Sequence, residues 1–87
     1  MRLSNAVAGV EYVITTIEAP VPSNLGDLGI YPGARAVVVM RLPFGGPVLL
    51  DLYGSQVALD RAIAARVAVR FHRAKSAFKP DMIDVIL

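Results

Sequence analysis

Two apolar runs joined by a short glycine- and proline-containing loop constrain the fold of this chain most strongly. The runs extend from Arg35 to Leu42 and from Val48 to Tyr53, are rich in Val and Leu, and flank Phe44-Gly45-Gly46-Pro47. Two such runs separated by a short loop with glycine are typical of a β-hairpin. Gly29 and Pro32-Gly33 predict a turn just before the first run, because glycine reaches positive φ at little cost and proline fixes φ.

The alternation within this hairpin assigns one face of each strand to the core, because side chains two apart lie on the same face. The predicted core residues are Ala36, Val38, Met40, Leu42, Val48, Leu50 and Leu52. A face that meets water is expected to be polar, but Val37, Val39, Leu49 and Tyr53 interrupt the opposite face. We interpret these four residues as an exposed apolar stripe that binds a partner. A register shift of one residue would exchange the two faces.

The remaining strands are predicted on either side of the hairpin. β-branched residues alternate from Val10 to Ile17 and predict a strand there. Shorter strands are predicted from Gln56 to Leu59 and from Val67 to Phe71. The order of these elements predicts an all-β domain with one or two short helical turns, built as a small five-stranded barrel of the SH3 type.

The short helical turns are predicted from capping residues. Ser23 is the expected N-cap of a turn that ends at Gly29, with Leu25 and Leu28 sharing its inner face. Asp60 is the expected N-cap of a second turn over residues 61–65.

Residues suited to chemistry are sparse. The chain has 87 residues and no cysteine, which fits one domain without disulfides or thiolate metal sites. Its one histidine, His72, has no neighbour in the sequence that would form a triad. Asp81 and Asp84 are three positions apart, but two carboxylates and one remote histidine fall short of a ferrous site. We therefore expect no enzyme, no catalytic residues, no cofactor and no functional metal site. The loop at Phe44 lacks the Lys-Ser/Thr ending of a phosphate cradle. Phe44 is a candidate contact residue for a different reason, because an aromatic side chain at a loop tip loses little entropy on binding.

Charge and hydropathy limit the class of partner. No apolar run approaches the roughly 18 residues of a spanning helix, and the N-terminus does not resemble a signal peptide, so a cytoplasmic location is expected. The net charge is +2, and six basic residues lie in the last third of the chain. Nucleic-acid binding is not expected, because neither a broad basic face nor interleaved aromatic residues accompany them.

The glycine and proline motifs together resemble the ferrous iron transport protein A (FeoA) family. The resemblance runs from about Leu3 to Val69 and rests on Leu28-Gly29-Ile30, Pro32-Gly33, Pro43-Phe44-Gly45-Gly46-Pro47 and Gly54. It implies an SH3-like domain over residues 1–71 and a small accessory protein of bacterial ferrous iron uptake. The implied partner is the ferrous iron transporter protein B, a membrane permease with a cytoplasmic GTP-binding region, so the protein would be peripheral to the membrane only through that partner.

Residues 72–87 form a C-terminal extension that is basic first and apolar afterwards. We expect it to dock on the barrel or on a neighbouring chain, so the apolar stripe has three candidate occupants: this extension, a second copy in a homodimer, or the transporter. Two other functions remain open at this point. One is a metal-dependent regulatory domain like the C-terminal part of metal-dependent repressors, and the other is an iron-binding metallochaperone.

Overall fold

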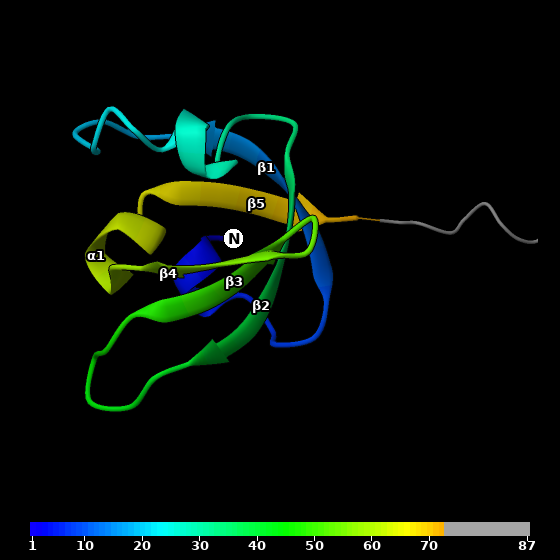
Figure 1. The fold of residues 1–87 in the computed structure, drawn as a ribbon, viewed down its shortest axis with the longest axis vertical. Helices are drawn as coiled ribbons and strands as arrows, with labels where there is room; N and C mark the ends of the chain where they lie inside the picture. Colours follow the sequence, from blue (N-terminus) through cyan, green and yellow to red (C-terminus); the bar gives the residue numbers. More distant parts are fainter. Residues whose placement is uncertain (73–87) are drawn as a thin grey trace, which may run out of the picture.

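The computed structural model describes residues 1–72, which fold around one antiparallel sheet (Figure 1). Its strands are β1 (Glu11–Ile17), β2 (Arg35–Arg41), β3 (Val48–Leu52), β4 (Ser55–Leu59) and β5 (Val67–Phe71). Two 3₁₀ turns, η1 (Leu3–Asn5) and η2 (Gly26–Leu28), and one short helix, α1 (Arg61–Ala64), complete the described part. The strand order is β4-β3-β2-β1-β5, which confirms the predicted five-stranded all-β fold.

The hairpin of β2 and β3 is irregular at one position. Val38 pairs with Leu50, but the next pair is Met40 with Leu49, and the register therefore shifts at Val39. This is a β-bulge, in which two residues of one strand oppose one residue of the other. Beyond the bulge, Arg41 pairs with Val48, and the loop of residues 42–47 projects from the end of the hairpin (Figure 1).

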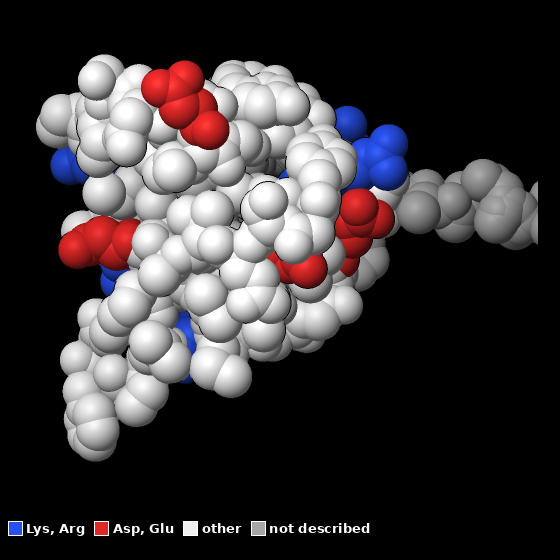
Figure 2. All heavy atoms as spheres, in the orientation of Figure 1, with Lys and Arg blue, Asp and Glu red and all other residues white. Residues whose placement is uncertain are grey.

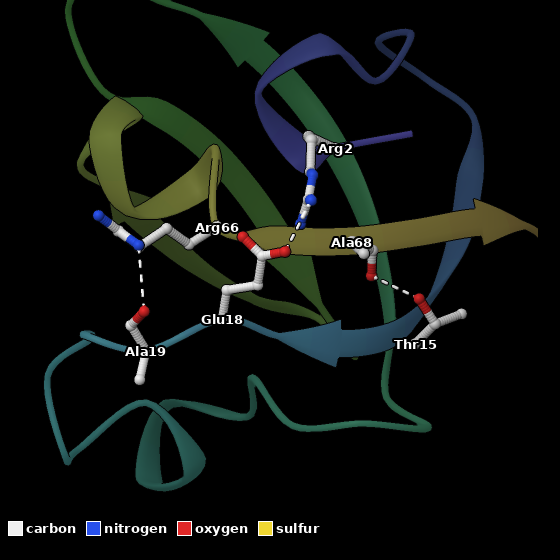
Figure 3. Close-up of polar contacts among 6 residues, drawn as sticks. All are labelled: Arg2, Thr15, Glu18, Ala19, Arg66 and Ala68. Atoms are coloured by element: carbon white, nitrogen blue, oxygen red, sulfur yellow. Dashed lines mark hydrogen bonds and ion pairs between the residues drawn. The ribbon is translucent and has the colours of Figure 1, made fainter.

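The N-terminus covers the outer edge of β5. The backbone N–H of Val69 donates to the carbonyl of Met1 (2.8 Å), and Arg2 forms an isolated bridge with Ala68. Three polar contacts tie β1 and the residues that follow it to the N-terminus and to the β5 region (Figure 3). They are Arg2 Nη2 to Glu18 Oε2 (2.8 Å), the Thr15 hydroxyl to the Ala68 carbonyl (3.1 Å), and Arg66 Nη1 to the Ala19 carbonyl (3.1 Å). Covering the middle of an edge strand in this way limits its pairing with another chain.

The core lies inside the curved sheet and is apolar throughout. Its largest fully buried side chains are Tyr12, Leu3, Ile14, Ile30, Leu50, Val38, Val48 and Val67. The buried Tyr12 hydroxyl accepts a hydrogen bond from the backbone N–H of Val7 (3.0 Å), as a buried phenol requires. The Tyr12 ring also meets the ring of Phe71 edge-on, with centroids 5.8 Å apart.

For two residues of the predicted core the prediction is wrong, because their side chains are exposed in the structure. Met40 is 47% exposed and Leu42 is 37% exposed, whereas Ala36 and Val38 of the same strand are buried. The cause is the bulge at Val39, which moves every later residue of β2 out of the simple alternation. The predicted core residues of β3, which carries no bulge, are all buried.

The two helical turns form where the capping residues place them, with one error. Asp60 caps α1, because its Oδ1 atom accepts from the backbone N–H of Ala62 (2.8 Å). Gly29 ends η2 in the left-handed conformation, at φ 96°. Ser23 is not the N-cap of this turn, since η2 begins after Leu25. The turn is consequently shorter than predicted, and Leu28 is 39% exposed instead of sharing an inner face with the buried Leu25.

The predicted C-terminal extension lies almost wholly outside the described residues. Its first residue, His72, continues the pairing of β5 with β1, because its backbone N–H donates to the Glu11 carbonyl (3.1 Å). The predicted docking of residues 73–87 stays a prediction.

Candidate interaction surface

An apolar patch lies on the outer face of the β2–β3 hairpin. It consists of Val39, Met40 and Leu49, and we call it the hairpin patch. Met40 lies opposite Leu49 in the ladder, and Val39 is the extra residue of the bulge beside them. Val39 and Met40 are 37% and 47% exposed, and Leu49 is half-buried. Apolar side chains of adjacent strands that meet solvent together are typical of an interaction surface.

The rest of the predicted stripe lies in a different environment. Val37 is half-buried between two carboxylates, because it pairs with Glu11 of β1 on one side and with Asp51 of β3 on the other. Tyr53 is 67% exposed, and its hydroxyl accepts a hydrogen bond from the backbone N–H of Arg35 (3.0 Å). The structure therefore divides the four predicted residues into two pairs. Val39 and Leu49 lie in an apolar surface, whereas Val37 and Tyr53 lie next to charged side chains.

Val37 and Tyr53 line a shallow pocket of about 200 Å³, which we call the Tyr53 pocket. Its other lining residues are Glu11, Arg35, Ala36 and Asp51. His72 stands beside it, with its Nε2 atom 4.0 Å from Glu11 Oε1. Within residues 1–72, no group of three or more His, Cys, Asp or Glu side chains is close enough to hold a metal ion. The pocket offers both signs of charge and one aromatic ring, which suits a polar contact with a partner.

The loop between β2 and β3, residues 42–47, is the most exposed apolar feature of the described chain. Phe44 at its tip has a relative exposure of 103%. Its φ is 60°, a left-handed conformation that costs a residue with a Cβ about 1–2 kcal/mol. The following residue, Gly45, is also left-handed, at φ 72°, where glycine carries no such cost.

Two arginines lie at the base of this loop. Arg61 of α1 donates from Nε to the Gly46 carbonyl (3.0 Å) and from Nη2 to the Leu42 carbonyl (2.9 Å), so one guanidinium bridges both ends of the loop. Arg41, the last residue of β2, donates from Nη1 to the Ala6 carbonyl. Sequence reasoning missed Met40, Arg41 and Arg61 as parts of this surface. Only the two arginines carried a signal, their positive charge, and it does not reveal contacts with distant carbonyls.

No helix of the described part is both long and apolar enough to cross a lipid bilayer. The candidate surface is thus a projecting hairpin with an apolar outer face, an apolar tip, two arginines at the base of its loop and a charged pocket farther along the sheet.

A family model described as the FeoA domain matches residues 1–71. No curated protein sequence matches the chain. Among solved structures, the chain is similar to the solution structure of an iron(II) transport protein A from Clostridium thermocellum, with 26% identity and a TM-score of 0.75. That match covers 82% of this chain but 45% of the Clostridium chain, so this chain spans about half the length of that relative.

Two further structures match over more of their own length. A FeoA protein from Chlorobium tepidum has 27% identity and a TM-score of 0.75, covering 90% of this chain and 76% of that one. A FeoA from Stenotrophomonas maltophilia, solved with zinc, has 25% identity and a TM-score of 0.67, covering 80% and 89%. It is described as a prokaryotic SH3 domain protein and as a candidate activating factor of bacterial ferrous iron transport.

Proposed function

Because this chain belongs to the FeoA domain family, we propose that it is an accessory protein of bacterial ferrous iron uptake that binds the cytoplasmic GTP-binding region of the ferrous iron transporter protein B. The chain shares its SH3-like fold with FeoA proteins, and this fold supports a function through contact with another protein. The observation that carries the proposal is the hairpin patch, in which Met40 and Leu49 form an outward-facing apolar pair.

The hairpin patch suits a protein partner because the sheet holds it in place. Val39 and Met40 belong to β2 and Leu49 to β3, and the flanking pairs of Val38 with Leu50 and Arg41 with Val48 fix the backbone around them. Little conformational entropy is then lost on binding, which leaves more of the apolar burial for affinity. The Tyr53 pocket adds charged groups at the margin of the same sheet face, in keeping with the polar rim that surrounds apolar contacts in most interfaces.

Contact can regulate a transporter by shifting the balance between its conformational states. A bound protein shifts its partner between two states if it binds one state more tightly than the other. We therefore expect the affinity of this chain for the transporter to depend on the nucleotide in the GTP-binding region.

The test is a pull-down with the full chain as bait and membranes that contain the transporter, with GDP or with a GTP analogue. The double variant Val39→Ser and Met40→Gln should reduce capture at least about tenfold, because it removes the apolar character of the hairpin patch. Val7→Ser is the matched control, since Val7 is 57% exposed and lies outside the sheet. Unchanged capture by the double variant would show that the hairpin patch is not the contact surface.

A second copy of the chain and residues 80–87 are the other candidate occupants of the hairpin patch. Sedimentation of the full chain and of the double variant, together with dye binding by a variant that lacks residues 80–87, separates them. If the double variant dissociates a dimer and leaves transporter capture unchanged, the patch joins two copies. If the truncation alone exposes a dye-binding apolar surface, the C-terminal segment covers the patch.

A further inference from the structure

The loop of residues 42–47 has the features of a small membrane-binding element. We propose that this loop inserts its tip, Phe44, into the headgroup region of an anionic lipid bilayer, while Arg41 and Arg61 lie at the level of the lipid phosphates. The proposal concerns lipid and not the transporter, so it goes beyond the proposed function and can fail independently of it.

The side chains of the loop are the first observation. The sequence Leu42-Pro43-Phe44-Gly45-Gly46-Pro47 contains no side chain that carries a charge or forms a hydrogen bond. Phe44 is fully exposed and Leu42 is 37% exposed. In Figure 2 the lobe that this loop forms, at the lower left, shows no Asp or Glu atom on its visible face. A convex apolar knob of this kind can sink into the boundary between headgroups and acyl chains, where Phe and Leu are favoured.

The backbone of the loop is the second observation, because backbone groups that enter lipid need partners within the protein. Pro43 and Pro47 have no N–H to satisfy. The Leu42 N–H donates to the Pro47 carbonyl (3.0 Å) and the Gly46 N–H to the Pro43 carbonyl (3.1 Å). Arg61 occupies the carbonyls of Leu42 and Gly46. The loop thus satisfies the polar groups at its base internally, and those of the Phe44-Gly45 tip would lie among the polar headgroups.

The charges at the base are the third observation, and they favour lipid over a protein pocket as the occupant. Arg41 and Arg61 donate to backbone carbonyls, and neither forms an ion pair with a carboxylate within residues 1–72. Two such cations behind an apolar tip complement an anionic membrane surface. A protein pocket for Phe44 would be expected to add hydrogen bonds at about one per 100–200 Å², and no side chain of the loop can form one.

The backbone conformation of Phe44 agrees with a functional role for its ring. Phe44 stands at φ 60°, where Asn or Gly is accommodated more easily than an aromatic residue. A residue that adopts a costly backbone conformation suggests a functional role for that residue. Lipid insertion supplies one, because the exposed ring then leaves water.

The hairpin patch lies on the same hairpin as the loop, immediately behind its base. A chain anchored by its loop would present Val39, Met40 and Leu49 beside the membrane, where a membrane-embedded partner could be reached. One loop gives weak, reversible binding, since stable anchoring takes two independent signals. The protein contact and the lipid contact would then reinforce each other, because the first raises the effective concentration for the second.

The test measures partitioning of the full chain onto vesicles of phosphatidylcholine alone and of phosphatidylcholine mixed with phosphatidylglycerol. Wild type should prefer the anionic vesicles, with Arg41 and Arg61 each contributing about fivefold to the preference, and salt at about 1 M should abolish the preference. Phe44→Asn, which suits the left-handed backbone, should reduce partitioning at least about tenfold. Tyr31→Asn is the matched control, because Tyr31 is 46% exposed but lies in the loop before β2.

The contribution of charge is tested separately with Arg41→Gln, which should lower partitioning onto anionic vesicles. Arg70→Gln in β5 is the control, because it removes the same charge at a different place. The basic residues of 73–87 are present in every variant, so their attraction to anionic lipid cancels in these comparisons. Phe44→Trp adds a depth probe, because the chain contains no tryptophan. Its emission should shift to the blue with anionic vesicles, and lipids brominated along the acyl chains should quench it.

The proposal is overturned if Phe44→Asn partitions like wild type, or if the emission of Trp at position 44 does not shift. It is also overturned if wild type binds neither kind of vesicle and the Phe44→Asn variant no longer captures the transporter. The loop tip then binds a protein and not lipid. Vesicle binding that survives in the Val39→Ser and Met40→Gln variant, when transporter capture does not, would separate the two contacts and support both.

Discussion

Met40 lies opposite Leu49 on the outer face of the β2–β3 ladder, although simple alternation along β2 would turn Met40 towards the core. The bulge at Val39 produces this relationship, because it places two successive residues of β2 against one of β3. The consequence is an apolar surface at the end of the hairpin, next to the projecting loop, where an unbulged hairpin would place Met40 on the core face.

The outward position of Met40 predicts a small effect on stability when it is truncated. Met40→Ala should change the free energy of unfolding by no more than about 0.5 kcal/mol, as exposed substitutions usually do. Leu50→Ala, in the buried face of β3, should cost about 2–5 kcal/mol because it leaves a cavity. Urea unfolding followed by circular dichroism measures both. Comparable losses in the two variants would mean that Met40 packs in the core and that β2 has no bulge.

The sequence predicted the strands well and the bulge not at all, for a physical reason. Alternation, turn residues and the Asp60 cap are local signals, and they placed β3, β4, β5 and α1 within one residue at each end. A bulge depends on how two strands fit together, and nothing in Val37–Arg41 differs from a regular strand. The predicted assignment of β2 side chains to the core face is consequently correct up to Val38 and wrong at Met40.

The candidate surface was predictable only in part, for the same reason. Val39, Leu49 and Phe44 are exposed or half-buried in the structure, and their apolar character was visible in the sequence. The hydrogen bonds of Arg61 to Leu42 and Gly46 join residues 19 and 15 positions apart. Such contacts follow from the tertiary fold, in which α1 lies beside the hairpin loop, and no local pattern encodes them.

The left-handed conformation of Phe44 predicts that a suitable replacement stabilises the protein. Phe44→Asn should raise the free energy of unfolding by about 0.5–1 kcal/mol, because Asn tolerates positive φ better than Phe does. The melting temperature should rise by about 2–8 °C for a domain of this size. Phe44→Ala is the control, since Ala has a Cβ and no local hydrogen bond to offset the strain. Equal stability of the Asn and Ala variants would show that the loop is not strained at this position.

The hydroxyl of Tyr53 predicts a local effect at the start of β2. Tyr53→Phe removes the acceptor for the Arg35 N–H, so the free energy of unfolding should fall by about 0.5–1 kcal/mol. Hydrogen exchange at the Arg35 amide should become faster. Tyr31→Phe is the control, because the Tyr31 side chain forms no hydrogen bond within the part of the chain that the structure describes. Unchanged exchange at Arg35 would contradict the contact.

The bridging guanidinium of Arg61 predicts that lysine cannot replace it. Arg61 reaches the carbonyls of Leu42 and Gly46 with two different nitrogens of one rigid group. A lysine keeps the charge but concentrates its donors on one flexible ammonium. Arg61→Lys should therefore lower the free energy of unfolding by about 1–2 kcal/mol and speed hydrogen exchange at Gly46, whose N–H closes the loop onto Pro43.

The Arg61→Lys variant also separates the two roles of this residue at a membrane. Its charge is unchanged, so attraction to anionic vesicles should persist if charge alone matters. If the ordered loop matters as well, partitioning should fall below that of the matched control Arg70→Lys, because a loosened loop loses more conformational entropy when its tip inserts. Stability and Gly46 exchange equal to those of Arg70→Lys would mean that Arg61 does not hold the loop, and the case for a self-satisfied loop backbone would fall with it.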